Sequence, residues 1–346
     1  NNAGVFVITL TAMDAAGNTH TDTVEITVND TTDPTADAGL DQTVDQRDLV
    51  EFNGSGSLDN VGVNNYTWTF SDGGAKTLYG LMPNYTFQNV GNFTVTLNVT
   101  DAAGNWKTDT MWVLVNDIDA PVSGTAWNNT LTTGDKAFFS INLTDNVAVG
   151  SVMFNFTINN MTNYYWPVTN NTGDNWTIEI MIPSYAMWIE YFFWFNDTVA
   201  NMDKSAMDNL SVADNDKPML ENLKNGTLNT GDNTLFEIDI TDNININLTS
   251  VFFYYRYGGS AWMEELVSNR NGATWSISIL ILGNQTTIQY YFMVNDTSDN
   301  QNESAQSIWL PITDDDVPTV GNDLTTDIPK TGESFTIICE ATDNIG

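Results

Sequence analysis

Three acidic sequence markers recur in the same order along this chain and divide it into repeats of about one hundred residues. The first marker is an Asp-rich stretch ending in proline, and its prolines lie about 87, 97 and 100 residues apart. An Asp-Asn pair follows each proline by roughly 24–25 residues, and an Asp-led loop ending in Asn precedes each proline by roughly 20–22. The stretches are 28–34, 115–121, 212–218 and 312–318; the pairs are Asp59-Asn60, Asp145-Asn146, Asp242-Asn243 and Asp343-Asn344; the loops begin at Asp14, Asp101, Asp197 and Asp296.

The segments between the markers have the pattern of β-strands. Residues 92–100 alternate apolar and polar side chains with the period of two that a half-buried strand requires. Other segments are rich in β-branched and aromatic residues, and no helical period is present. About seven short strands in about 95 residues is typical of an immunoglobulin-like domain. We therefore predict an all-β chain of tandem immunoglobulin-like sandwiches in an extended array.

The markers also predict the domain boundaries. Residues 1–30 align with 88–117, the closing strands of a domain, whereas 318–346 align only with opening strands. The expected division is 1–30, 31–117, 118–213, 214–313 and 314–346. Two interpretations of the ends remain open: a segment of a longer repeat protein, or half-domains that complete each other head to tail between copies.

Charge restricts the possible partners. The chain has 10 Lys and Arg residues against 44 acidic residues, which gives a formal net charge of −34. Its hydrophobic residues, 41% of the total, are enough to form packed cores. So acidic a surface repels nucleic acid and anionic membranes, and it favours divalent cations. We expect no nucleic-acid partner.

Several kinds of chemistry are disfavoured. Cys339 is the single cysteine, so no disulfide can form within the chain, and His20 is the single histidine, which argues against histidine catalysis and zinc sites. Catalytic serine, metalloprotease and phosphate-loop motifs are absent from the sequence. No apolar run approaches the ~20 residues that cross a bilayer. The chain is predicted to be no enzyme and to contain no transmembrane segment.

Residues 34–117 resemble the PKD (polycystic kidney disease) domain, a seven-stranded sandwich. The resemblance rests on the motifs at 38–44, 52–59, 66–73, 85–87 and 91–97, although Ser71 stands where the family usually has Gly. Residues 118–213 and 214–313 lack the Trp-x-Phe-x-Asp-Gly signature and look more like bacterial and archaeal immunoglobulin-like surface repeats. The resemblance implies a fold and an extracellular, cell-surface setting rather than a reaction.

The Asp-rich markers are the best candidate site. In an immunoglobulin-like sandwich the N-terminal linker and the two marker loops lie at one end of the domain, so we expect them to meet at the junction with the preceding domain. Carboxylate and amide oxygens suit Ca²⁺, whereas the alternative is that Asp and Asn only form turns. Asn201 is a further possible ligand. The predicted ligands are Asp30, Asp33, Asp59, Asn60, Asp101, Asp117, Asp119, Asp145, Asn146, Asp197, Asp203, Asp214, Asp216, Asp242, Asn243, Asp296 and Asp299.

N-glycosylation is the second candidate. Roughly 19 Asn-x-Ser/Thr sequons occur where composition predicts about 8. Strand alternation in an Asn- and Thr-rich protein produces some of them unaided, but the same geometry turns both side chains outward. The predicted acceptors are Asn65, Asn84, Asn92, Asn98, Asn142, Asn155, Asn175, Asn196, Asn225, Asn247 and Asn284.

The aromatic residues divide between core and surface. Trp68, Trp112, Trp194 and Phe195 are predicted core residues, and Cys339 is predicted to be a small core residue of a strand at 335–339. Trp166 and Trp262 occupy matching positions, where they either pack over the sandwich edge or contact sugars or subunits.

These features predict a non-catalytic structural protein of the cell surface: a stalk, a surface-layer subunit or a filament subunit. The expected partners are copies of itself or neighbouring surface proteins. The alternative is an adhesin or the carbohydrate-binding region of a secreted hydrolase, with glycans as partners.

Overall fold

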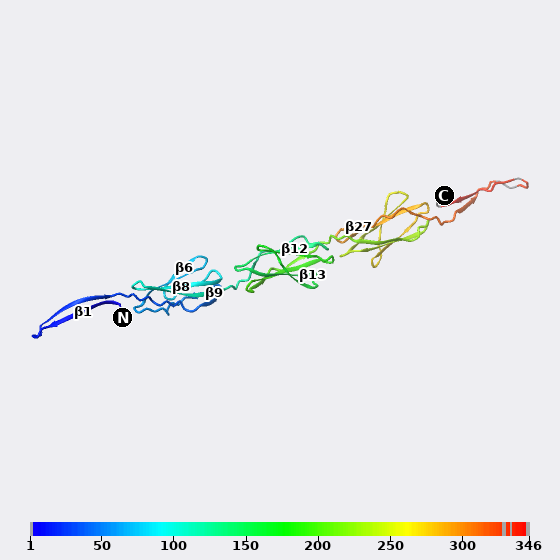
Figure 1. Cartoon of the computed structure of the whole chain (residues 1–346). Coiled ribbons are helices and arrows are strands. Elements are labelled where there is room, and N and C mark those ends of the chain that lie inside the picture. Colours follow the sequence, from blue (N-terminus) through cyan, green and yellow to red (C-terminus); the bar gives the residue numbers. More distant parts are fainter. Residues whose placement is uncertain (1–2, 327–329, 333, 344–346) are drawn as a thin grey trace.

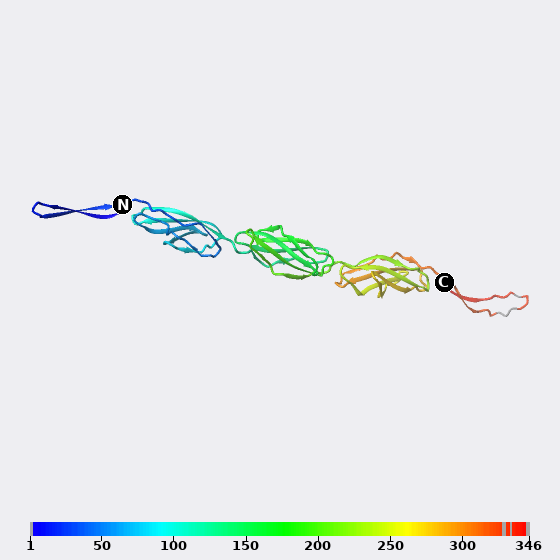
Figure 2. The ribbon, with the colours of Figure 1, turned by 90° about the horizontal axis from the view of Figure 1, so that it is seen from below.

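The structure is a computed structural model that describes residues 3–326, 330–332 and 334–343. Asn344, from the fourth Asp-Asn pair, lies outside the described residues. Every regular element in the described part of the chain is a β-strand, which confirms the all-β prediction. Figures 1 and 2 show three sandwiches in a line, with a two-stranded unit at either end. None of the described residues forms a helix with the length and apolarity needed to cross a bilayer.

The first domain comprises β3 to β9. Its main sheet has the order β3-β9-β8-β5-β6, with β3 parallel to β9, and β4 pairs with β7 apart from it. Phe52 stacks on Trp68, with ring centroids 5.3 Å apart, in the centre of the core. The strands are β3 (Gln42–Asp45), β4 (Val50–Glu51), β5 (Val63–Ser71), β6 (Ala75–Tyr79), β7 (Asn84–Tyr85), β8 (Gly91–Asp101) and β9 (Trp106–Asn116).

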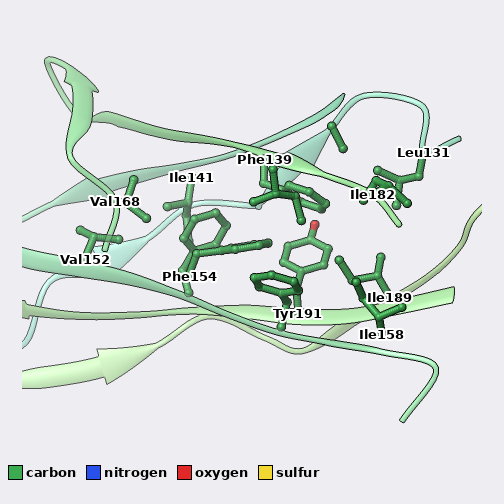
Figure 3. Packing of buried hydrophobic residues seen from close by; sticks show 14 of the residues in the cluster. Leu131, Phe139, Ile141, Val152, Phe154, Ile158, Val168, Ile182, Ile189 and Tyr191 are labelled. Atoms are coloured by element: carbon green, nitrogen blue, oxygen red, sulfur yellow. The ribbon is translucent and has the colours of Figure 1, made fainter. Parts of the chain in front are cut away.

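The second domain packs two sheets face to face. One has the order β10-β12-β16-β15 with β11 beside β12, and the other β14-β13-β17-β18 with β19 beside β17. Figure 3 shows Phe139, Phe154 and Tyr191 meeting between the sheets, with ring centroids 4.7 to 5.5 Å apart. The strands are β10 (Val122–Ser123), β11 (Trp127–Asn128), β12 (Lys136–Thr144), β13 (Val149–Ile158), β14 (Asn163–Pro167), β15 (Asn170–Thr172), β16 (Asn175–Met181), β17 (Trp188–Asp197), β18 (Met202–Lys204) and β19 (Asp208–Ser211).

The third domain repeats this arrangement. Its sheets have the orders β20-β21-β25-β24 and β23-β22-β26-β27, with β28 beside β26. Phe236, Phe253 and Tyr290 occupy the positions of the aromatic cluster of the second domain. The strands are β20 (Met219–Asn225), β21 (Asn233–Thr241), β22 (Ile246–Tyr257), β23 (Met263–Leu266), β24 (Asn269–Asn271), β25 (Thr274–Leu280), β26 (Thr287–Asp296), β27 (Gln301–Glu303) and β28 (Leu310–Pro311).

The two end units are single strand pairs. The register of β1 (Gly4–Met13) with β2 (Thr19–Val28) repeats that of β8 with β9, the last two strands of the first domain. Ile8 and Leu10 are 52% and 70% exposed, whereas their counterparts Val95 and Leu97 are fully buried. The other unit pairs β29 (Thr319–Asp323) with β30 (Cys339–Thr342).

Three residues that were predicted to lie in the core, Trp112, Trp194 and Cys339, lie outside it. Trp112 is 55% exposed because its neighbours Met111 and Val113 face the core, and strand alternation turns Trp112 outward. Trp194 is half-buried on the outer face for the same reason, between the buried Phe193 and Phe195. Cys339 is exposed, since among the described residues β30 pairs only with β29, and the strand predicted from residue 335 begins at Cys339. Trp68 and Phe195 are buried as predicted.

Candidate metal sites at the domain junctions

The three sequence markers meet in space at the start of each domain. Each meeting point contains one Asp from the linker, one from the Asp-Asn pair and one from the Asp-led loop. In each group, the carboxylate atoms available to a metal lie within 4.8 Å of one another. The first triad is Asp30, Asp59 and Asp101; the second is Asp117, Asp145 and Asp197; the third is Asp214, Asp242 and Asp296.

The Asp-led loop holds its carboxylate by hydrogen bonds to its own backbone. Asp197 Oδ1 accepts the backbone N–H groups of Val199 and Asn201 at 2.8 and 2.9 Å, and Asp197 Oδ2 accepts Asn201 Nδ2 at 2.7 Å. The same Asn201 amide also donates to the carbonyl of Asp117, at 3.1 Å, so it ties the loop to the linker. Asn105 and Asn300 make the equivalent contacts in the first and third triads.

The Asp of each of the first three Asp-Asn pairs uses one oxygen for its turn and leaves the other without a partner. Asp145 Oδ1 accepts the backbone N–H groups of Val147 and Ala148, at 2.8 and 2.9 Å. Its Oδ2 is buried and accepts no hydrogen bond, and the same holds for Asp59 Oδ1 and Asp242 Oδ1. A buried carboxylate oxygen without a donor is energetically costly unless something else compensates it.

The linker Asp has the same asymmetry. Asp117 Oδ1 accepts Asn146 Nδ2 at 3.0 Å, and Asp214 Oδ1 accepts Asn243 Nδ2 at 3.0 Å. The other oxygen of each, Asp117 Oδ2 and Asp214 Oδ2, is buried without a partner. Asn60 donates likewise to Asp30, at 3.3 Å. The second and third triads therefore each contain two unpaired buried carboxylate oxygens.

The triads concentrate negative charge, which the Arg47 guanidinium offsets in part through its electrostatic interaction with Asp117 of the second triad. In the described part of the chain the salt bridges are Arg47–Asp119 and Lys136–Glu179, and neither involves a triad member. Burial raises the pKa of Asp242, and the nearby charges of Asp214 and Asp296 raise it further. This arrangement is electrostatically unfavourable on its own and would be relieved by a bound cation.

The pKa of Asp197 is shifted in the opposite direction. Burial alone would raise it, but the hydrogen bonds from Asn201 and from the neighbouring backbone outweigh that effect and hold the pKa below its ordinary value. The pKa of Asp101 is lowered in the same way by the hydrogen bonds from Asn105. The loop therefore keeps its carboxylate charged where the three markers meet.

Eight predicted ligands lie outside the triads: the amides of Asn60, Asn146 and Asn243, which donate to the linker aspartates, and five further aspartates. Asp119 forms a bidentate pair with Arg47 of the preceding domain, both contacts being 2.8 Å, and Asp216 accepts Asn243 Nδ2 at 3.1 Å. Asp203 is exposed on β18, where it pairs with Phe195. The last two, Asp33 and Asp299, are exposed.

The preceding domain supplies a contact that the sequence reasoning missed. Thr133 of the second domain donates its hydroxyl to Asp214 Oδ1 at 3.0 Å, across the junction with the third domain. Gly134 follows with a φ of 70°, and a Cβ there would lie 3.5 Å from Asp216 Oδ2. The same Thr-Gly-Asp triplet recurs at Thr230, whose hydroxyl donates to Asp314 at 3.1 Å. This repeated triplet was the available sequence signal.

The predicted glycan acceptors differ in accessibility. Seven are exposed, namely Asn65, Asn84, Asn92, Asn142, Asn175, Asn225 and Asn284. Asn98, Asn196 and Asn247 are half-buried, and the Asn196 and Asn247 side-chain oxygens accept hydrogen bonds from Ser151 and Thr249. Asn155 is 7% exposed, so a glycan could not be attached there without displacing its neighbours. Glycosylation at the accessible acceptors stays a prediction.

The two tryptophans that were predicted to match both lie against the sandwich, but their positions are not equivalent. Trp166 pairs with Phe154, whereas the equivalent Phe253 pairs with Glu265. Trp166 packs edge-on against Phe156, at 5.5 Å between centroids, and remains 42% exposed. Trp262 contacts Tyr291 edge-on at 4.9 Å, and the Arg256 guanidinium lies 4.5 Å over its ring. These contacts agree with the packing alternative.

Comparisons with known proteins place one domain in a family. No curated protein matches the sequence. Two solved structures are similar over 90% of this chain and 82% of theirs: a tetra-tandem repeat in the extending region of a large adhesion protein (17% identity, TM-score 0.37) and a Ca²⁺-stabilized adhesin that helps an Antarctic bacterium bind ice (15%, 0.30). A third, the Bacteroides ovatus mixed-linkage glucan protein SGBP-B, has 14% identity and a TM-score of 0.24, over 88% of this chain and 76% of its own. Residues 31–115 match the PKD domain, the family that the sequence motifs of this region predicted.

Proposed function

We propose that this chain is a non-catalytic structural spacer of the cell surface, whose domain junctions are stiffened by Ca²⁺. The observation that carries the proposal is the repetition of one acidic triad at three successive junctions. A catalytic pair of carboxylates is ordinarily found once in an enzyme, whereas a device that fixes the angle between domains is needed at every joint. The linear order of the three sandwiches supports the role of a spacer (Figure 1).

The donor set favours calcium over other metals. All the triad side chains offer oxygen, which hard cations prefer, and the Asp-rich loops contain neither His nor Cys. Ca²⁺ takes about 6–8 oxygen ligands in flexible geometry, and it would bind the buried oxygens of Asp117, Asp145, Asp214 and Asp242 that lack a hydrogen-bond donor. A cation there joins the linker to two loops of the following domain, so its loss leaves the linker held only by hydrogen bonds such as those from Asn146 and Asn201 to Asp117.

Calcium titration of the whole chain tests the proposal. We expect isothermal titration calorimetry and elemental analysis to give three bound Ca²⁺ ions, one for each triad. A matched chain with the exposed Asp33, Asp203 and Asp299 all changed to Asn should bind the same number. The calcium assignment would be refuted if no calcium were bound at millimolar concentration. It would also be refuted if the control chain bound fewer ions than the natural chain.

The proposed location is extracellular. A surface this acidic keeps the chain soluble. The chain has no disulfide to reinforce it, so Ca²⁺, which is abundant outside cells, suits its junctions.

Head-to-tail association between copies stays a prediction. The exposed apolar face of the β1–β2 hairpin supports it, and sedimentation velocity at high protein concentration would test it.

A further inference from the structure

One face of the first domain carries no charged side chain. Strand alternation turns every second residue of β5, β6, β8 and β9 away from the core, and the four strands are neighbours in one sheet, so these residues form one continuous surface. This surface, the neutral face, consists of alternate residues from 65 to 71, 75 to 79, 92 to 100 and 106 to 114. In a chain with 44 acidic residues and a net charge of −34, an uncharged face is a departure from the rest of the surface.

Hydroxyl groups dominate the neutral face. Cross-strand pairing aligns four threonines in one row across all four strands, namely Thr77, Thr69, Thr96 and Thr110. Within the described residues, no side chain of the neutral face makes a hydrogen bond to another part of the protein. Thr69, Thr77 and Thr110 are exposed, so their hydroxyls are available to a second molecule.

The corresponding faces of the other two domains carry charge. Glu190 of the second domain occupies the position of Thr94, since each lies seven residues before the Asp of its Asp-led loop. Glu264 of the third domain occupies the position of Thr77, and its carboxylate accepts the Tyr254 hydroxyl at 2.7 Å. The sandwich fold therefore does not require a neutral face, and in the third domain the same place is charged and hydrogen-bonded from within.

Three large aromatic side chains project from the neutral face. Tyr79, Trp106 and Trp112 are 73%, 58% and 55% exposed. Leu114 lies beyond Trp112 on β9 and is also exposed. Tryptophan and tyrosine are the residues that often contribute most of the binding energy at a protein interface. These side chains supply the apolar area that the threonine row lacks.

We propose that the neutral face binds the neutral face of a second copy of this chain, side by side. Two copies with a net charge of −34 repel each other, and the repulsion is weakest where both surfaces are uncharged. A twofold contact brings like groups together, and hydroxyls suit it because each can both donate and accept a hydrogen bond. This lateral contact is distinct from head-to-tail association, and no triad residue takes part in it.

The size of the neutral face fits a weak, reversible dimer. Four strands about 4.8 Å apart and about 17–37 Å long present roughly 600 Å², which is less than the ~800 Å² per partner of a standard interface. Charge resumes at the edge strand β3, where Asp45 pairs with Asn116, so the rim of the contact is acidic. Asn65, Asn92 and Asn98 lie on the neutral face, so pairing requires that these predicted acceptors carry no glycan.

Analytical ultracentrifugation of the whole chain, produced without glycosylation, tests the proposal. We expect a monomer–dimer equilibrium with a Kd of roughly 10–100 µM, and a lower Kd at higher salt, because salt screens the repulsion between the acidic surfaces. Thr96→Glu puts a charge at the centre of the neutral face and should weaken the dimer about tenfold or more. Ser278→Glu adds the same charge at an exposed strand position of the third domain and should leave the Kd unchanged.

Three results would overturn the proposal. The first is a chain that stays monomeric at about 1 mM in high salt; retention of that monomer on cellulose, abolished by Trp112→Ala, would then assign the face to a polysaccharide. The second is a dimer that neither Thr96→Glu nor Thr110→Glu weakens, where the fully exposed Thr110 decides the matter if Thr96→Glu fails to fold. The third is a dimer that Leu10→Glu abolishes, since such a dimer forms through the β1–β2 hairpin.

Discussion

Asp242→Asn is expected to stabilise the calcium-free third domain and to destabilise the calcium-saturated one. Without a cation, Asp242 is a carboxylate held near two others, and burial together with their charges raises its pKa. Two unit charges 4.8 Å apart repel by about 3 kcal/mol at an effective dielectric of about 20. Because solvent screens a partly exposed group, we expect a gain of about 1 kcal/mol, or about 4–8 °C in the Tm of this domain.

With calcium present the sign reverses. The variant loses a charged ligand, and with it the stabilisation by a ligand that binds only the folded state, about 2.7 kcal/mol at a hundredfold excess over its Kd. The calcium-free effect should also depend on pH. A carboxyl whose folded-state pKa is raised destabilises the domain above that pKa, and this penalty disappears as the pH falls below the unfolded value of about 4.

Calorimetry with and without chelator, together with hydrogen exchange in β21, β22, β25 and β26, measures the effect in the third domain. Asp299→Asn is the matched control, because Asp299 lies in the Asp-led loop but outside the triad, and should change neither state. If Asp242→Asn destabilises the domain equally in both conditions, the aspartate acts only through the turn hydrogen bond that it accepts from the Ile244 backbone N–H.

Phe139→Ala should unfold the second domain at a much lower temperature and leave the other two domains intact. Phe139 is fully buried, and its ring contacts Phe154 and Tyr191 at 4.7 and 4.8 Å between centroids (Figure 3). Truncating a buried phenylalanine costs about 3–5 kcal/mol, a large part of the stability of one domain. Each domain has its own cluster of buried residues, so the damage should stay local.

Phe138→Ala provides the control for this experiment. Phe138 precedes Phe139 on β12 but faces outward and is 46% exposed, so its loss should cost less than about 1 kcal/mol. Hydrogen exchange resolved by domain distinguishes the two variants. Simultaneous destabilisation of all three domains by Phe139→Ala would contradict the independence of the cores.

The fold was predictable because strand alternation and repeated turn residues are local signals. The alternating segment at 92–100 is the middle of β8, and the buried Trp68 and Phe195 follow the same rule. Trp112 and Trp194 were assigned to the core on the same grounds as Trp68 and Phe195, and for these two residues the prediction was wrong. Trp112 and Trp194 occupy the outward positions of their strands, which only the parity of the neighbouring residues reveals.

The candidate site was partly predictable for a topological reason. Three loops at one end of a sandwich must lie close together, so their Asp residues could be grouped from the sequence. Two details depend on side-chain geometry and could not be predicted. One is which oxygen of Asp145 remains unpaired, and the other is the hydrogen bond by which the Asn201 side-chain nitrogen ties the loop to the linker. The burial of Asn155 could not be predicted, because its sequon has the same alternating pattern as those whose Asn is exposed.

Small-angle X-ray scattering of the whole chain during a calcium titration tests the central claim most directly. The chain with Asp59, Asp145 and Asp242 all changed to Asn serves as the comparison. We predict that chelation shortens the maximum dimension and broadens the distance distribution of the natural sequence, because freed linkers bend, while each sandwich stays folded. The triple variant should give the broad distribution with or without calcium. An unchanged scattering profile in the natural chain, at calcium levels where binding would saturate, would contradict the claim that calcium stiffens the junctions.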